Sequence, residues 1–477
     1  MKKKSFIAFA AFAALSAFTA EPARVVVDVS VKTGPVKAVN GVGQPPMIGA
    51  LADWRMMHYL KEAGVPYARL HDVGGWLGGG LYVDIPNLFP DFDADETDSA
   101  NYRFVYTDSL MAQLVKNGVE PFFRLGVTIE NFVERGYPPV WSMPPKDFAK
   151  WARICEHVIR HYTEGWADGF RYKIEYWEIW NEPDNMPAPE RNPLWRGSFK
   201  EFMEFYGTVA PYLKAKFPHL KIGGYASCGF YAGVGAGRVK AANSSPRLEY
   251  FVECAKDFLA AARDKGWPLD FFSYHSYSEP KEALRQVAYA DRLLNEYGFT
   301  VDRTQRIFNE WLPYVSHENL GSALQAAGIA AEMIGLQNGP CDIACVYDAR
   351  CDVGNYSPLF NPMTLKPHKA YYALVAFNEL RKLGSAVRCT SSDDDVFAAA
   401  AADGGNVALM AVNLSDKPVQ VVFSGLPENV SCRLTDTRRT HAEVALPSEL
   451  PAHSFVVVTG KTQYRQSSCA GGKNEVE

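Results

Sequence analysis

The chain has 477 residues, of which 47% are hydrophobic and 22% are charged, and its formal net charge is −5. This balance is typical of a folded globular protein and excludes a chain that is disordered throughout. No Lys/Arg-rich block follows the N-terminus, so the basic patch of a nucleic-acid-binding protein is missing. The composition therefore predicts a globular protein with no nucleic-acid partner.

The first 20 residues have the pattern of a secretory signal peptide. Three lysines, Lys2 to Lys4, precede an apolar run from Phe6 to Phe18, which is too short to cross a bilayer. The alternative is an N-terminal helix that is buried or that tethers the chain to a membrane. We expect a periplasmic or extracellular protein whose mature form is soluble and has no membrane partner.

The nine cysteines show no disulfide framework, and their odd number leaves at least one thiol unpaired within a single chain. Cys341, Cys345 and Cys351 lie close in sequence, but no Cys/His pair follows at zinc-binding spacing. We interpret them as small buried residues. The cysteines therefore predict no metal site, and the sequence as a whole predicts no cofactor.

After the signal peptide, the residues from Arg24 to Val31 alternate apolar and polar side chains, as a half-buried strand does. Strand-like runs then alternate with amphipathic stretches. Asp147 and Ser198 stand where helix N-caps are expected. The strand-like runs are 36–42, 65–70, 120–125, 172–180, 221–225, 269–274, 306–308 and 342–347. The helix-like stretches are 108–117, 145–162, 199–217, 248–265, 282–297, 322–337 and 368–383.

Strict alternation of strands and helices predicts a parallel sheet in an α/β protein. Eight such repeats over residues 36–384 favour a closed (β/α)₈ barrel. An open, doubly wound sheet is the alternative, but no GxGxxG turn follows the first strand. The Gly-rich run at 74–80 lacks the GK[ST] ending of a phosphate loop, so we interpret it as a flexible loop over the barrel mouth.

The pattern changes near residue 385 to short strands separated by turns. Asp403, Gly404 and Gly405 between apolar runs indicate a hairpin. We therefore predict a small all-β, sandwich-like domain over residues 385–461, whose sheet includes the N-terminal strand at 24–35. The polar tail at 462–477 is predicted to be disordered.

In a (β/α)₈ barrel the reacting groups lie at the C-terminal ends of the strands. Asn181, Glu182 and Pro183 end the fourth strand, and the run from Phe308 to Trp311, with Asn309 and Glu310, ends the seventh. Each strand therefore places one glutamate at its last position. Two carboxylates at one barrel mouth suit a glycosidase. One is protonated to give a proton to the leaving oxygen, while the other is ionised to attack the sugar or to activate water.

The stretch YWEIWNEPDN (176–185) places Glu178, Trp180 and Glu182 at alternate positions. If one strand carries all three into the lumen, Glu178 lies deep, Trp180 above it and Glu182 at the rim. We expect Glu178 to be held by an Arg or Tyr. Trp180 or the charge of Glu310 is expected to raise the pKa of Glu182. Asn181 can donate to a sugar hydroxyl beside the reacting carbon.

Five sequence blocks stand out along the barrel region. They are ARLHD (68–72), NGVEPFFRLG (117–126), YWEIWNEPDN (176–185) with the nearby Leu194-Trp195, LDFFSYHSY (269–277) and FNEW (308–311). Together they resemble glycoside hydrolase family 39, which includes β-xylosidases and α-L-iduronidases of the retaining clan A. The blocks occur in the family's order, and the resemblance spans about residues 36–383. One departure is Asn309, where the family usually has Thr, and it leaves the identity of the sugar open.

The resemblance implies a retaining mechanism with Glu182 as acid/base and Glu310 as nucleophile. Four further residues match positions that line the family's −1 subsite, namely His71, Asn181, His275 and Tyr277. Trp311 is a candidate for stacking on a sugar, although it can equally fill the core. Arg124, Trp76 and Tyr347 are weaker candidates for the rim.

We therefore expect a secreted, β-xylosidase-like retaining glycosidase that acts on oligosaccharides or polysaccharides of plant or host origin. One alternative is an α-L-iduronidase-like uronidase, in which Arg124 or Arg350 would pair with the sugar carboxylate. Another is a carbohydrate-binding barrel without catalysis. The sequence does not indicate which oligomeric state the protein adopts.

Overall fold

The structure is a computed structural model that describes residues 21–47, 54–73, 82–128, 142–234 and 245–461. The predicted signal peptide, the Gly-rich run with Trp76 and the C-terminal tail lie outside the described residues. Within the described ranges, no helix has both the length and the apolar character needed to cross a membrane.

Eight parallel strands close into a barrel. The closure is made by the first and last strands, since Gly41 pairs with Cys345 and Val42 with Val346. This ring confirms the predicted barrel and excludes the open sheet. The strands are β2 (Ala38–Gly43), β3 (Tyr67–Leu70), β4 (Glu120–Leu125), β5 (Tyr176–Ile179), β6 (Lys221–Ser227), β7 (Phe271–Ser276), β8 (Gln305–Trp311) and β9 (Ile343–Val346).

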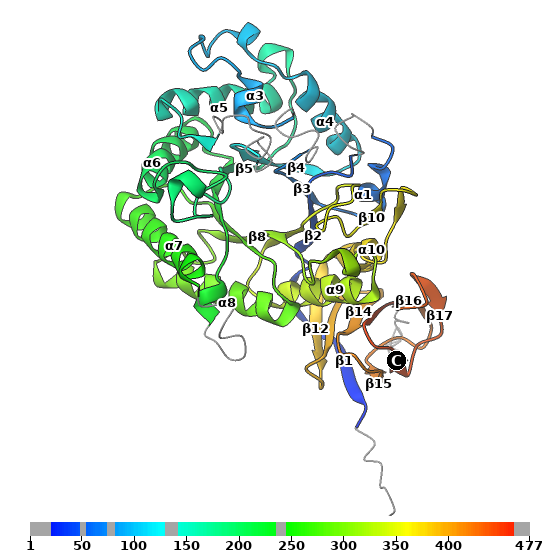
Figure 1. The fold of residues 1–477 in the computed structure, drawn as a ribbon. Helices are drawn as coiled ribbons and strands as arrows, with labels where there is room; N and C mark the ends of the chain where they lie inside the picture. The colour runs from blue at the N-terminus through cyan, green and yellow to red at the C-terminus, as the bar shows by residue number, and fades with distance from the viewer. Residues whose placement is uncertain (1–20, 48–53, 74–81, 129–141, 235–244, 462–477) are drawn as a thin grey trace, which may run out of the picture.

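The helices form a ring around the strands (Figure 1). A helix lies between each strand and the next, as predicted, and the first of these helices is short. They are α1 (His58–Glu62), α4 (Val105–Lys116), α5 (Phe148–Thr163), α6 (Phe199–Lys216), α7 (Pro246–Lys265), α8 (Pro280–Glu296), α9 (Ala323–Asn338) and α10 (Tyr371–Arg381). A small helix, α3 (Ile85–Leu88), lies in the long connection after β3.

Helix α5 illustrates how the sequence specifies these elements. The side chain of Asp147 accepts a hydrogen bond from the backbone N–H of Lys150, which satisfies one of the free donors at the helix start. Buried residues recur at three- and four-residue intervals and place one apolar face against the barrel. They include Trp151, Ile154, Cys155, Val158, Ile159 and Tyr162. Ser198 caps α6 in the same way.

The barrel lumen is filled in layers. Because side chains alternate along a strand, residues two apart point inward together. The lower layer is apolar and consists of Phe122, Tyr176, Phe271, Ile307, Ile343 and Cys345. The layer above it is polar and contains Arg69, Glu178, Ser273 and Asn309. The lumen is therefore closed below, so a substrate can enter only from the strand ends above the polar layer.

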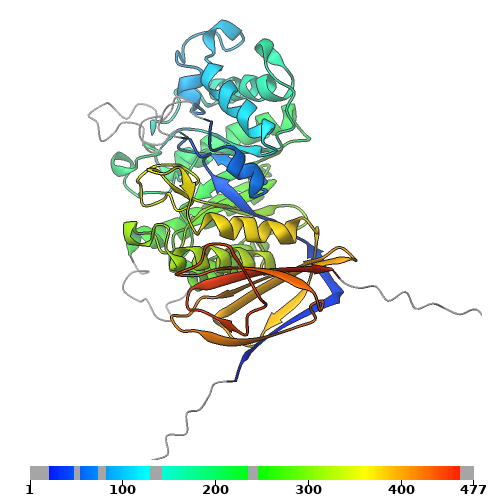
Figure 2. The ribbon, with the colours of Figure 1, turned by 90° about the vertical axis from the view of Figure 1, so that its right-hand side faces the viewer.

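The C-terminal region forms a nine-stranded sheet beside the barrel. Strand β1 lies within it, antiparallel to β12 and parallel to β15, and Figure 2 shows this blue strand running along the orange sheet. The sheet contains β1 (Ala23–Pro35), β12 (Ser385–Ser391), β13 (Val396–Ala402), β14 (Asn406–Asn413), β15 (Val419–Ser424), β16 (Val430–Thr435), β17 (Ala442–Val444), β18 (Glu449–Leu450) and β19 (Ser454–Lys461).

The two faces of this sheet pack differently. One face forms its own apolar cluster, which includes Val25, Leu409 and Val456. The other face, with Ala401 and Met410, joins the main core, where α9 and α10 contact β13, β14 and β19. Alternating residues along each strand supply the two faces, so the sheet is attached to the barrel by a continuous apolar layer.

Candidate active site

The segment after β5 explains the spacing of Glu178, Trp180 and Glu182. Strand β5 ends at Ile179, and Trp180 has a positive φ of 69°. Its indole Nε1 donates to the carbonyl of Leu194 at 3.0 Å. The ring packs in the helix layer, against Trp151, Trp195 and Phe205. The expectation that Trp180 lies in the lumen is therefore wrong, because strand alternation stops at Ile179.

Glu182 lies three residues beyond the end of β5 rather than at its last position. It has a φ of 44°, and its backbone N–H donates to the carbonyl of Ala226 at 3.0 Å. Positive φ is uncommon for a residue other than glycine and is concentrated at functional sites. The turn directs a side chain that is only 9% exposed into the barrel mouth. Nδ1 of His275 donates to its Oε1 at 2.8 Å, and Nδ2 of Asn185 donates to its Oε2 at 2.7 Å.

Glu310 reaches the same mouth through a β-bulge in β8. Tyr274 pairs with Phe308, but His275 pairs with Glu310, so Asn309 is the additional residue. As a result, Asn309 and Glu310 both face inward. Tyr277 donates its hydroxyl hydrogen to Oε1 of Glu310 at 2.5 Å.

The two glutamates lie close together. Oxygens of Glu182 and Glu310 and a ring nitrogen of His275 all lie within 4.8 Å of one another. Nδ1 of His275 is 3.7 Å from Oε1 of Glu310, so this ring faces both carboxylates. Such a group has the ligand types and spacing to hold a metal ion.

A buried arginine supports the pair from below. Arg69 donates through Nε to Glu178 at 2.7 Å, through Nη1 to Glu310 at 2.9 Å and through Nη2 to Asn181 at 2.5 Å. Glu178 also accepts from Ser273 and Asn309. Glu178 therefore belongs to a structural network, as expected. Because the amide oxygen of Asn181 already accepts from Arg69, the amide nitrogen of Asn181 is the atom that can donate into the cavity.

His71 and its neighbours form one wall of the site. Nε2 of His71 lies 3.2 Å from Oδ1 of Asp72, and the hydroxyl of Tyr347 donates to Oδ2 of Asp72 at 2.9 Å. Gly43 makes this arrangement possible, because a Cβ there would lie 2.8 Å from the Tyr347 ring. Burial and the charges of the nearby arginines hold the pKa of His71 well below its usual range, so the ring is neutral.

The pKa of Glu182 reflects opposing effects. Burial raises the pKa, whereas hydrogen bonds from His275, Asn185 and Cys228 lower it below the usual value of a glutamate. The sequence analysis expected a raised pKa from Trp180 or Glu310. That expectation is wrong, because Trp180 is elsewhere and the donors outweigh burial.

Two further candidates do not reach the cavity. Trp311 is fully buried and stacks on Phe308, with ring centroids 6.1 Å apart, in the layer between barrel and helices. The bulge that turns Glu310 inward leaves Trp311 facing outward, so its predicted contact with sugar is wrong. Arg124 is also fully buried, where its Nη2 lies 2.7 Å from Oδ1 of Asp84.

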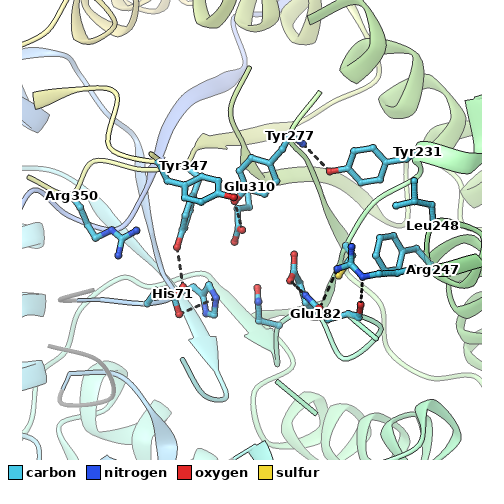
Figure 3. Close-up of a pocket in the computed structure, with 15 residues that line it drawn as sticks. His71, Glu182, Tyr231, Arg247, Leu248, Tyr277, Glu310, Tyr347 and Arg350 are labelled. Carbon is cyan, nitrogen blue, oxygen red and sulfur yellow. Dashed lines mark hydrogen bonds and ion pairs between the residues drawn. The ribbon is translucent and has the colours of Figure 1, made fainter. Parts of the chain in front are cut away.

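A cavity of about 370 Å³ opens above the two glutamates. His71, Asn181, Glu182, Tyr277 and Glu310 line it, and His275 lies behind Glu182. Sequence reasoning missed several lining residues or gave them little weight. They are Asp72, Asn185, Cys228, Tyr231, Arg247, Leu248, Phe251, Tyr347, Arg350 and Tyr356. Figure 3 shows Arg350, Tyr347 and His71 on one side of the glutamates and Arg247, Leu248 and Tyr231 on the other.

A closed (β/α)₈ barrel with two adjacent carboxylates in a cavity at its strand ends is the arrangement that many glycoside hydrolases use. The sequence model of the family described as "Glycosyl hydrolases family 39" matches residues 40–323, which is more than half of the chain. The chain belongs to this family.

Comparisons with individual proteins agree with this assignment. A beta-xylosidase of Geobacillus stearothermophilus is 27% identical over 212 residues, and the match covers 42% of this chain and 36% of that relative. The chain therefore spans little more than a third of that relative's length. A glucosidase structure from Croceicoccus marinus has a TM-score of 0.70 at 19% identity, covering 92% of this chain and 98% of that one. A family 39 beta-xylosidase from Caulobacter crescentus has a TM-score of 0.63 at 19% identity, covering 91% and 99%. At these identities the two structures show a common fold.

Proposed function

We propose that this glycoside hydrolase cleaves its substrate with retention of configuration, with Glu310 as nucleophile and Glu182 as acid/base. The observation that carries the proposal is the approach of the two carboxylates to within 4.8 Å. Retaining enzymes hold their carboxyl groups about 5–5.5 Å apart, whereas inverting enzymes need about 6.5–9.5 Å to admit a water molecule.

In the first step, Glu310 attacks the anomeric carbon while Glu182 gives its proton to the departing oxygen. Arg69 and Tyr277 donate hydrogen bonds to Glu310 and hold its carboxylate in place. His275 donates a hydrogen bond to Glu182, and Glu182 regains the proton it has given up from water in the second step. The product of this step is a glycosyl-enzyme intermediate and a free leaving group.

In the second step, Glu182 takes a proton from water, and the resulting hydroxide attacks the anomeric carbon and releases Glu310. Asn181 is positioned to donate its amide N–H to the sugar hydroxyl next to the reacting carbon, because its oxygen is already bonded to Arg69. A contact of this kind strengthens in the transition state and lowers the barrier.

We propose a β-xylosidase-like specificity, supported by the beta-xylosidase relative and by the family 39 beta-xylosidase structure. The pattern of residues 1–20 supports secretion, and plant or host glycans remain the proposed substrates. A uronidase requires a cation for the sugar carboxylate. Arg350 lines the cavity, but its Nε lies 2.9 Å from Asp348 and 3.5 Å from Asp352. These two carboxylates already offset its charge, which favours the xylosidase.

A panel of nitrophenyl glycosides tests the proposal, with xyloside, arabinosides, glucoside, galactoside and glucuronide assayed in parallel. We expect turnover of the xyloside, and its loss in both Glu182→Gln and Glu310→Gln. Proton NMR of the first product then reports whether the anomeric configuration is retained. Activity that survives Glu310→Gln would refute the nucleophile, and an inverted product would refute the mechanism. Binding of xylo-oligosaccharides without hydrolysis would instead support a carbohydrate-binding barrel.

A further inference from the structure

The cavity extends beyond Glu182 into a second half that the reaction itself does not use. The nucleophile Glu310 must face the sugar carbon, and the acid Glu182 must face the bond to the leaving group. The leaving group therefore continues past Glu182, away from His71 and Tyr347. On that side lie Tyr231, Arg247 and Leu248 (Figure 3). Phe251 also lines the cavity and packs against Arg247.

Arg247 is the charged group of this half. Its Nε donates to the carbonyl of Asn185 at 2.7 Å, and its Nη2 donates to Oδ1 of the same residue at 3.1 Å. The guanidinium also lies over the ring of Phe251, 4.7 Å from its centroid. One edge of the guanidinium is thus fixed, and the remaining Nη1/Nη2 edge is the fork that suits a carboxylate.

Arg247 differs from the two other arginines near the cavity, because no carboxylate offsets its charge within the described residues. Arg69 pairs with Glu178 and Glu310, and Arg350 pairs with Asp348 and Asp352. Within the described residues, no carboxylate of the chain lies within ion-pair distance of Arg247. A half-buried, immobilised cation on a cavity wall is a binding element for an anion.

Asn185 connects this cation to the acid. Its amide nitrogen donates to Glu182, while its two oxygens accept from Arg247. An anion bound by Arg247 would therefore be held beside the group that protonates the leaving oxygen.

We propose that Arg247, fixed by Asn185 and Phe251, forms a leaving-group subsite for an acidic substituent, and that the enzyme prefers leaving groups that carry a carboxylate, such as an acidic sugar. This inference rests on the proposed function and adds the chemistry of the group that departs. It assigns Arg247 to substrate binding rather than to the chemical step.

The test compares a 4-carboxyphenyl glycoside with the matched neutral 4-carbamoylphenyl glycoside, both carrying the sugar that the panel identifies. We expect the carboxylate to be favoured in kcat/KM, and Arg247→Met to reduce the ratio of acid to amide about tenfold or more, mainly through KM. Arg247→Lys keeps the charge without the fork and should retain part of the preference. The exposed Arg191, which does not line the cavity, provides the matched control Arg191→Gln with an unchanged ratio.

An equal ratio in wild type and Arg247→Met would overturn the proposal. If Arg247→Met does not fold, the ratio in Arg247→Lys and its decrease with added salt decide the question. A 4-sulfophenyl glycoside that is hydrolysed faster than the carboxyphenyl compound would overturn the choice of carboxylate in favour of a sulfated leaving group. Failure to hydrolyse either of the two matched compounds would refute the proposed glycosidase reaction instead.

Discussion

Arg69 and Glu310 form a buried ion pair in which Nη1 lies 2.9 Å from Oε2, with exposed side-chain fractions of 1% and 8%. The same guanidinium pairs with Glu178 at 2.7 Å. One cation on β3 therefore compensates two carboxylates, one structural and one proposed to react.

Replacement of Arg69 by Met should damage both stability and activity. The change leaves Glu178 and Glu310 buried without a cation, and removal of one member of a buried pair typically costs about 3–5 kcal/mol. We expect urea unfolding to show a loss of this order and the residual turnover to be very low. Arg69→Lys keeps the charge and should lose less stability. A fully stable Arg69→Met protein would show that the pair contributes nothing to folding.

Replacement of Tyr277 by Phe should lower kcat about 10- to 100-fold while KM changes little. The hydroxyl donates to Glu310 at 2.5 Å, and a hydrogen bond to a charged group contributes about 1.5–3 kcal/mol. Tyr274, on the strand that ends just before Tyr277, provides a control, because no group among the described residues bonds its hydroxyl. Tyr274→Phe should leave turnover unchanged, and an equal loss in both variants would contradict the role of Tyr277.

Replacement of His275 by Phe should move the alkaline limb of the kcat/KM profile to higher pH. His275 donates to Glu182 and lowers its pKa, so loss of this donor raises that pKa. An acid with a raised pKa keeps its proton to higher pH. The profile is measured on a substrate with a poor leaving group, for which protonation limits the rate. His275→Asn restores an N–H donor and should shift the limb less. A shift toward lower pH would contradict the assignment.

Replacement of Asp184 by Asn should change how stability depends on pH. Burial raises the pKa of Asp184 to about 6, and its carboxylate accepts from the hydroxyl of Ser227 at 2.8 Å. The folded state therefore binds this proton more tightly than the unfolded state. Protonation of Asp184 therefore stabilises the folded state. This contribution is fully present below about pH 4 and is lost as the pH rises through about 6.

Asn cannot titrate but can still accept a hydrogen bond, so the Asp184→Asn protein should not show this loss of stability. Between pH 4 and pH 7, the free energy of unfolding of the Asp184→Asn protein should rise by about 3 kcal/mol relative to that of the wild type. Urea unfolding at several pH values measures the difference. Parallel stability curves for the two proteins would show that Asp184 does not titrate in this range.

The barrel could be predicted from sequence because each repeat combines a short apolar strand with an amphipathic helix. The two glutamates could be predicted because both lie near strand ends. The positions of Trp180 and Trp311 could not be predicted, since the alternation of side chains between two faces holds only along a continuous strand. A positive φ at Trp180 and a bulge at Asn309 break that continuity, and neither has a clear signature in the residues themselves.

The leaving-group half of the cavity was also beyond sequence reasoning. Arg247 lies in the first turn of α7 and contacts Asn185, which lies 62 positions earlier in the chain. Only the packing of α7 against the loop after β5 brings them together. Asn185 itself stands inside the motif of the acid, three residues after Glu182, and this spacing is the one local signal that could have drawn attention to it.

Strand β1 has a consequence for the order of events during synthesis. It pairs with β12 and β15, so it leaves the ribosome about 350 residues before its first partner, which at about 5–20 residues per second is a delay of tens of seconds. During that interval both hydrogen-bonding edges of this amphipathic segment are unpaired and can pair with other chains. The barrel can assemble while β1 is still unpaired, but the nine-stranded sheet can form only after translation has nearly finished. A nascent chain stalled before β12 should therefore need a chaperone at β1.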